Sequence, residues 1–184
     1  MIHTLLEFDA GILLFLQEFV RNRFLTPVLV FITRLGDAGM IWIALSLIFL
    51  CFKKTRRTGC MSLLALFFSL CVNNLFLKQI VARTRPYDAI PDLVPLVARL
   101  TDFSFPSGHS AAAFSAAGVF VKTLPKRFGI PLFLFAVVIA LSRLYVGVHY
   151  PSDVLCGVIS GLLISYAARF CVDKVWRQPE SGTA

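Results

Sequence analysis

Long apolar stretches constrain what this chain can fold into more than any other feature. Five stretches contain at most one residue each of the types Asp, Glu, Lys, Arg and His; they cover residues 39–52, 59–77, 103–121, 128–148 and 154–168. The two such residues inside them are His109 and Arg143. A helix rises ~1.5 Å per residue, so a run of about 20 residues crosses a hydrocarbon core of ~30 Å. The sequence therefore predicts an all-α, polytopic membrane bundle.

The N-terminal segment gives a weaker signal. Residues 5–20 are rich in leucine and phenylalanine, but their polar interruptions are Glu7, Asp9, Gln17 and Glu18. The segment lacks the basic start and small-residue cleavage site of a signal peptide. We expect an amphipathic helix in the membrane interface, and a sixth span is the alternative. Residues 24–35 form a second interfacial or re-entrant piece that leads into the span beginning near Gly39.

These assignments give about five to six transmembrane helices with an N-terminal interfacial helix. They form one membrane-embedded domain over residues 1–177, followed by a disordered tail at residues 178–184. The five cysteines, with no CxxC pattern or Cys/His metal spacing, are interpreted as small apolar packing residues. No metal or other cofactor is expected.

The formal net charge of +8 raises the question of nucleic-acid binding, but the positive charges gather in three places. The clusters are Lys53, Lys54, Arg56 and Arg57; Lys122, Lys126 and Arg127; and Arg169, Lys174 and Arg177. Five spans taken in order place all three clusters on one side of the membrane. This is the positive-inside pattern, so that side is predicted to be cytoplasmic. No nucleic-acid partner is expected.

Three short polar segments at the ends of apolar stretches carry the candidate chemistry. In the first, Lys78 and Arg85 are seven residues apart, about two helical turns, which predicts a shared helix face. Arg85 precedes a proline, which marks a helix end. Arg83 lies off that face and is expected to meet lipid headgroups. A positively charged helix end at the membrane surface is the simpler explanation of this segment alone.

The second segment is Pro106-Ser107-Gly108-His109, which opens an apolar helix rich in alanine and serine. Ser107 suits the N-cap, and Gly108 allows a ligand to approach the backbone closely. Free amide groups at a helix N-terminus favour an anion, although plain capping also explains this tetrapeptide. The small residues that follow, and Gly157 with Gly161, predict close helix packing.

The third segment contains Arg143, His149 and Asp153. A charge inside an apolar run costs about 2.5–3.5 kcal/mol on insertion scales, so intramembrane charges tend to be functional and paired. Pro151 suits the first position of a helix, which puts Asp153 in the first turn. From there its carboxylate can reach back to His149, fix the tautomer and leave the other ring nitrogen free as a nucleophile. A capping aspartate near an interfacial histidine is the alternative.

The spacing Lys-x6-Arg-Pro, Pro-Ser-Gly-His and Ser-Arg-x5-His-x3-Asp resembles the three signature motifs of the type 2 phosphatidic acid phosphatase superfamily, which also includes vanadium haloperoxidases. Every motif position is filled here. The resemblance implies that His149 is a nucleophile that forms a phosphohistidine and that Asp153 orients it. It implies that His109 is the general acid and later the base. The residues implied to hold the phosphoryl oxygens are Lys78, Arg85, Arg143, Ser107 and Gly108.

The resemblance and the membrane pattern together predict a metal-independent lipid phosphatase of the plasma membrane, with its site on the outer face and its C-terminus cytoplasmic. Undecaprenyl diphosphate is the preferred substrate, because the outward topology suits a carrier lipid released on that face. The alternatives are phosphatidylglycerophosphate or phosphatidic acid, and a phosphotransferase that uses the same histidine. A transporter is disfavoured because paired half-helix repeats are missing. The loop of residues 87–102 is expected to shape headgroup access, with candidates Asp88, Asp92, Arg99 and Asp102.

Overall fold

The computed structural model describes residues 2–176, and every regular element among them is a helix, which confirms the all-α prediction. The predicted tail at residues 178–184 lies outside the described residues. The longer helices are α1 (Ile2–Phe15), α2 (Leu25–Leu35), α3 (Met40–Cys51), α4 (Arg56–Ser69), α7 (Gly108–Thr123), α8 (Lys126–Tyr145) and α9 (Pro151–Trp176). The short ones are α5 (Lys78–Val81), α6 (Pro86–Ala89), the 3-10 turn η2 (Asp37–Gly39) and the π-helical segments η1 (Leu16–Val20) and η3 (Leu70–Leu77).

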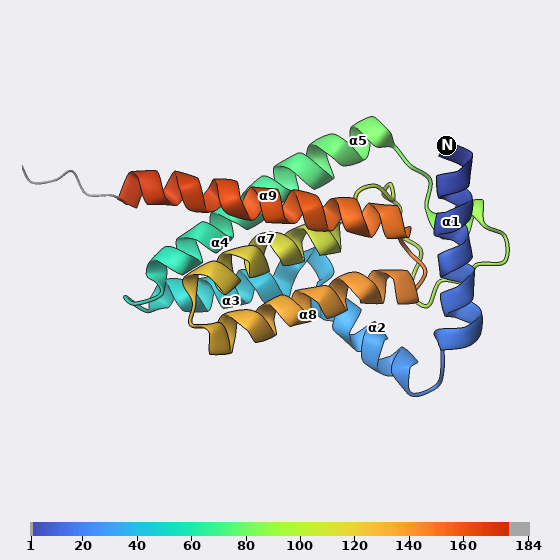
Figure 1. The fold of residues 1–184 in the computed structure, drawn as a ribbon, viewed down its shortest axis with the longest axis horizontal. Coiled ribbons are helices and arrows are strands. Elements are labelled where there is room, and N and C mark those ends of the chain that lie inside the picture. Colours follow the sequence, from blue (N-terminus) through green and yellow to red (C-terminus); the bar gives the residue numbers. More distant parts are fainter. Residues whose placement is uncertain (1, 177–184) are drawn as a thin grey trace, which may run out of the picture.

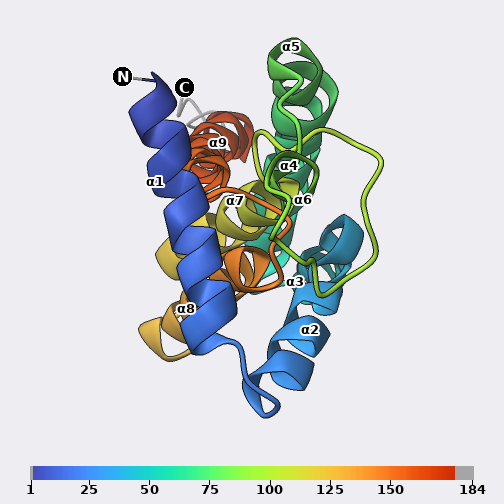
Figure 2. The same ribbon diagram turned by 90° about the vertical axis from the view of Figure 1, so that its right-hand side faces the viewer.

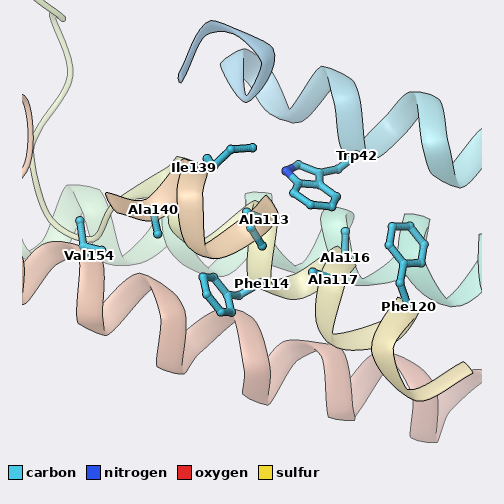
Figure 3. Close-up of a cluster of buried hydrophobic side chains, with 10 residues drawn as sticks. Trp42, Ala113, Phe114, Ala116, Ala117, Phe120, Ile139, Ala140 and Val154 are labelled. Carbon is cyan, nitrogen blue, oxygen red and sulfur yellow. The ribbon is translucent and has the colours of Figure 1, made fainter. Parts of the chain in front are cut away.

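Helix α7 forms the centre of the bundle, and α4, α8 and α9 pack around it (Figures 1 and 2). Its alanines are small enough to let the neighbouring helices approach, and Phe114 and Phe120 fill the remaining space. Trp42 of α3 packs on the same cluster, with its ring centroid 6.4 Å from that of Phe120 (Figure 3). The core therefore lies along α7, the helix that begins with the second polar segment.

The contact between α7 and α9 depends on glycine. A Cβ atom added at Gly161 would lie 2.6 Å from the carbonyl oxygen of Ala111, and one at Gly157 would lie 2.7 Å from that of Ser107. Only a residue without a side chain allows the backbones this close. The predicted small-residue packing is confirmed, and it fixes the start of α7 against the start of α9.

The N-terminal helix α1 runs across one end of the bundle, whereas α3, α4, α7, α8 and α9 run along it (Figure 1). Its exposed side includes Phe8, Phe15 and Leu6, while Asp9 and Leu13 are buried against the bundle. This arrangement favours the interfacial helix over the sixth span.

The predicted number of five to six spans is not confirmed. Within residues 2–176, three helical stretches are long and apolar enough to cross a membrane: Arg56–Ala89, α8 and α9. The pair formed by α2 and the segment Asp37–Cys51 is bent by 49° and would make a fourth, as a broken span or a re-entrant loop. The bend follows from left-handed backbone at Ala38 and Gly39. Helix α7 has 16 residues and is shorter than the spans around it.

The segments that carry the predicted basic clusters lie at one end of the bundle, on the left in Figure 1, at the α3–α4 turn, the α7–α8 turn and the end of α9; Arg177 of the third cluster lies outside the described residues. An ion pair of 2.6 Å between Arg57 and Asp173 joins two of these places. The three polar segments lie at the opposite end, beside α1.

Candidate active site

The first polar segment does not have the predicted geometry. The helix ends at Val81, because Ala82 takes a left-handed conformation with φ 46°, and Arg85 lies beyond this break as the residue before α6. Lys78 and Arg85 still converge, because both bind Asp102, but they do not share a helix face. The prediction of a common face was therefore wrong, although the two cations do meet.

The meeting point of these two cations is Asp102. Lys78 Nζ lies 2.5 Å from Asp102 Oδ2, and Arg85 Nη2 lies 2.6 Å from Asp102 Oδ1. Both cations are nearly buried, whereas the carboxylate is about half exposed at 49%. Partial burial alone would raise the pKa of Asp102, but its hydrogen bond with Lys78 and the charges of Lys78 and Arg85 lower the pKa to about 2. The carboxylate is therefore an anion held between two cations.

The second segment caps α7 as expected. Ser107 is the N-cap, and its Oγ accepts a hydrogen bond of 3.4 Å from the amide of Ser110. Ser107 is fully buried, whereas Gly108 faces the open site close to the side chain of Asn74. His109 Nε2 lies 2.9 Å from Asp37 Oδ1 in the turn between α2 and α3. The capping turn thus presents His109 to a carboxylate 72 positions earlier in the chain.

The third segment brings Arg143 to the same place. Its side chain is 2% exposed, and its Nη1 donates a hydrogen bond of 2.5 Å to Thr33 Oγ1. Its Nε has no hydrogen-bond partner among the described residues. A buried guanidinium with an unused donor destabilises the fold unless a ligand accepts a hydrogen bond from that donor. Arg143 is therefore suited to bind an anion.

His149 is buried between a carboxylate and a cation. Its Nδ1 lies 3.7 Å from Asp153 Oδ2 and 3.5 Å from Ser104 Oγ, and its Nε2 lies 3.5 Å from Arg85 Nη1. Ser104 also donates to Asp153 Oδ2 at 2.5 Å and so connects the carboxylate with the ring. Burial, with the charges of Arg143 and Arg85, lowers the pKa of His149 to about 3, although Asp153 acts in the opposite direction. The imidazole is neutral near pH 7, with Nε2 on the side of the cations.

Asp153 was predicted to reach back to the imidazole of His149, and its Oδ2 lies 3.7 Å from Nδ1 of that ring. The same oxygen accepts a hydrogen bond of 3.1 Å from the amide of Tyr150. The other carboxylate oxygen of Asp153 is held by Arg83, whose Nη1 lies 2.6 Å from Oδ1. Arg83 Nη2 in turn lies 2.9 Å from Oδ2 of the buried Asp9 on α1, which also accepts from the amide and hydroxyl of Ser152. The expectation that Arg83 meets lipid headgroups was wrong, because two buried carboxylates bind it.

These side chains meet in a cavity of about 650 Å³. Its polar end is lined by Lys78, Arg85, Asp102, Gly108, His109, Arg143 and His149. Its other part is lined by the apolar side chains Ile43, Leu63, Leu66, Phe67 and Leu70 of α3, α4 and η3. Phe67 and Leu70 are also exposed, and both belong to a helical stretch that is long and apolar enough to cross a membrane. Ser107 and Asp153 are fully buried and are not among the residues that line the cavity.

Comparison with known proteins decides the family. The family model described as the PAP2 superfamily matches residues 58–177, which include all three polar segments. The chain belongs to the PAP2 superfamily. It is accordingly a membrane lipid phosphatase of the kind that works without a metal ion.

Two relatives show how this PAP2 chain compares with curated proteins. It is 32% identical over 142 residues to an undecaprenyl-diphosphatase of Sulfolobus acidocaldarius, covering 77% of this chain and 68% of that protein. It is 33% identical over 170 residues to phosphatidylglycerophosphatase B of Bacillus subtilis, covering 86% of this chain and 80% of that one.

A solved structure agrees with the fold of this PAP2 chain. The crystal structure of a transmembrane PAP2-type phosphatidylglycerolphosphate phosphatase from Bacillus subtilis superposes with a TM-score of 0.77 at 32% identity. The match covers 96% of this chain and 90% of that one.

Several residues at the site were not found by reading the motifs; they are Asp9, Thr33, Asp37, Asn74 and Ser104. Asp9 gave a signal that could have been used, because it is a charge in an apolar segment, the same criterion that singled out Arg143. The bond between Asp37 and His109 joins distant parts of the chain and has no local signal.

Proposed function

We propose that this PAP2 phosphatase removes the terminal phosphate from undecaprenyl diphosphate, giving undecaprenyl phosphate and inorganic phosphate. The observation that carries this proposal is the cavity, which has cations and two histidines at one end and apolar side chains at the other. One amphiphile with a phosphorylated head and a long hydrocarbon tail matches both parts. A soluble phosphate ester would use only the polar end.

In the first chemical step, His149 Nε2 attacks the terminal phosphorus. The bond between phosphorus and the bridging oxygen breaks, and His109 gives a proton to that leaving oxygen. Asp153 and Ser104 face Nδ1 and support the positive charge that develops on the ring. Lys78, Arg85 and Arg143, with the amide of Gly108, stabilise the phosphoryl oxygens as charge redistributes over them.

In the second step, water attacks the phosphorus of the phosphohistidine. His109 takes a proton from this water, and the bond between phosphorus and Nε2 breaks. The products are inorganic phosphate and a neutral His149, so the enzyme returns to its starting state. Asp37, at 2.9 Å from His109, is suited to hold the ring of the acid–base residue in place during both steps.

The choice of undecaprenyl diphosphate as the substrate depends on the orientation of the protein in the membrane. With the three basic clusters in the cytoplasm, the polar end of the cavity faces outward, where the spent carrier lipid is released as a diphosphate. The undecaprenyl-diphosphatase among the relatives agrees with this choice. Phosphatidylglycerophosphate is the second candidate, because the curated and structural relatives from Bacillus subtilis are named for it.

A phosphate-release assay with purified protein in mixed micelles tests the proposal. The panel is undecaprenyl diphosphate, phosphatidylglycerophosphate, phosphatidic acid and a soluble phosphate ester, with the His149→Ala variant as the blank. We expect kcat/KM for undecaprenyl diphosphate to exceed that for every other compound. A higher kcat/KM for phosphatidylglycerophosphate would replace the proposed substrate, and equal rates on the soluble ester would remove the role of the apolar part.

A further inference from the structure

Asp102 occupies an unusual position for a carboxylate, because it lies between two side chains that the proposed mechanism needs for phosphate. Its oxygens lie 2.5 Å from Lys78 and 2.6 Å from Arg85, distances typical of strong charge-assisted bonds. It lines the same cavity as His109 and His149. A phosphoryl group that bound both cations would compete with this carboxylate for the same donors.

Arg85 does not need the carboxylate to keep its position. Its Nε donates at 2.8 Å to the backbone carbonyl of Asp102, and its Nη1 donates at 2.8 Å to the carbonyl of Val148. These backbone bonds remain when the Asp102 side chain rotates away. Lys78 Nζ has only Asp102 as a hydrogen-bond partner among the side chains described, those of residues 6–176, and an ammonium can donate three bonds. Both cations can therefore accept another anion.

Neither burial nor regular secondary structure holds the carboxylate of Asp102 in place. It is about half exposed, and it belongs to a segment without regular secondary structure between α6 and α7. A carboxylate that only held Lys78 and Arg85 in place would be expected deep behind them, as Asp153 is behind His149. Asp102 instead lines the same cavity as the two cations and is far more exposed than either of them.

We propose that Asp102 is an internal competitor of the substrate phosphate, which pairs with Lys78 and Arg85 when the site is empty and is displaced when a phosphoryl group binds. This inference rests on the proposed function, because it takes Lys78 and Arg85 as phosphate ligands. It adds a residue that sets the affinity of the site. By returning to the cations, Asp102 also helps to expel the inorganic phosphate left after hydrolysis.

The expected change in phosphate affinity depends on the fraction of enzyme in which Lys78 and Arg85 are not paired with Asp102. When a binding-competent state is populated by a fraction f, the apparent dissociation constant rises by 1/f. If the ion pair is closed about nine-tenths of the time, phosphate affinity is lowered about tenfold. Asp102→Asn keeps the shape and removes the charge, so it should recover about this factor.

The test is equilibrium binding of inorganic phosphate to the purified full chain in detergent, at fixed pH and ionic strength. The matched control is Asp88→Asn, which removes the same charge from the preceding helix α6. Asp88 pairs at 3.2 Å with the exposed Arg99 and not with either cation. We expect phosphate to bind about tenfold more tightly to Asp102→Asn than to the wild type, with Asp88→Asn close to the wild type.

The phosphate-binding data can contradict the inference about Asp102 in two ways, and a further variant tests the phosphate site itself. Equal or weaker phosphate binding to Asp102→Asn would overturn the inference, because it would mean that the carboxylate positions the cations instead of competing for them. An equal gain in Asp88→Asn would also overturn it, since the effect would then be general electrostatics. Adding Lys78→Met to Asp102→Asn should abolish the gain; phosphate binding unchanged by Lys78→Met would remove the proposed phosphate site itself.

Discussion

Replacing Gly157 by alanine would change the active site through helix packing alone. The new Cβ would lie 2.7 Å from the carbonyl oxygen of Ser107 and 3.1 Å from the Cβ of Ser110. The first distance is about 0.7 Å short of an ordinary contact at 3.4 Å. Because the obstacle is backbone, α7 and α9 must separate at the point where α7 presents Gly108 and His109 and α9 follows His149.

The stability cost of this change is modest. Overpacking destabilises a fold by ~1–3 kcal/mol, whereas replacing glycine by alanine inside a helix stabilises it by about 1 kcal/mol. The net loss of folding stability is therefore about 0–2 kcal/mol. A displacement of about 1 Å between reacting groups can cost ~100-fold in rate. We therefore expect kcat of Gly157→Ala to fall at least about tenfold, measured as phosphate release at saturating substrate, while thermal unfolding in detergent shifts by only a few degrees.

Gly161→Ala is the matched control. It creates the same kind of overlap, at 2.6 Å from the carbonyl oxygen of Ala111, but one turn farther from the site. It should lose as much stability as Gly157→Ala with a smaller loss of kcat. The reasoning is refuted if the two variants lose kcat in parallel, or if Gly157→Ala is as active as the wild type.

Three further outcomes are expected. Phosphate release should persist in excess EDTA, because side-chain cations do the work of a metal; complete loss restored by Mg²⁺ would contradict this. The pKa of His149 is about 3 in the folded protein and about 6.5 in the unfolded chain, which therefore binds the extra proton between these values. As pH falls from 6 to 4, the unfolding free energy of the wild type should therefore decrease, relative to that of His149→Gln, by up to about 1.4 kcal/mol per pH unit. If the unfolding free energies of the two proteins depend on pH in the same way, this expectation is wrong. Asp9→Asn should lower kcat about tenfold with KM unchanged, because Arg83 loses the charge that holds it toward Asp153; an unchanged kcat would limit this contact to a structural role.

The sequence was sufficient to predict the helical membrane class and the residues that gather at one end of the bundle. These features have local causes: uncharged runs define the helices, and motif residues sit where the runs end. The break at Ala82 had no such cause. It depends on contacts with distant segments, including the bond from the Ser104 amide to the carbonyl of Arg83, so the helix was expected to continue.

Arg83 likewise has no local signal for its partners, so it was expected to meet lipid headgroups. Its partners Asp9 and Asp153 are about 70 residues away on either side, and only the folded chain brings them together. Of the contacts among His149, Ser104 and Asp153, only the one between His149 and Asp153 was predicted. The relation of Asp153 to His149 follows from one helical turn, whereas Ser104 enters from the loop before α7.

The most direct test of the account is to trap the covalent intermediate. Rapid quench with substrate labelled in its terminal phosphate should give acid-labile, base-stable label on the peptide that contains His149. The label should be absent from His149→Ala and should accumulate in His109→Ala, in which hydrolysis of the phosphoenzyme is slowed. Label that persists without His149 and disappears without His109 would contradict the assignment of nucleophile and acid–base residue.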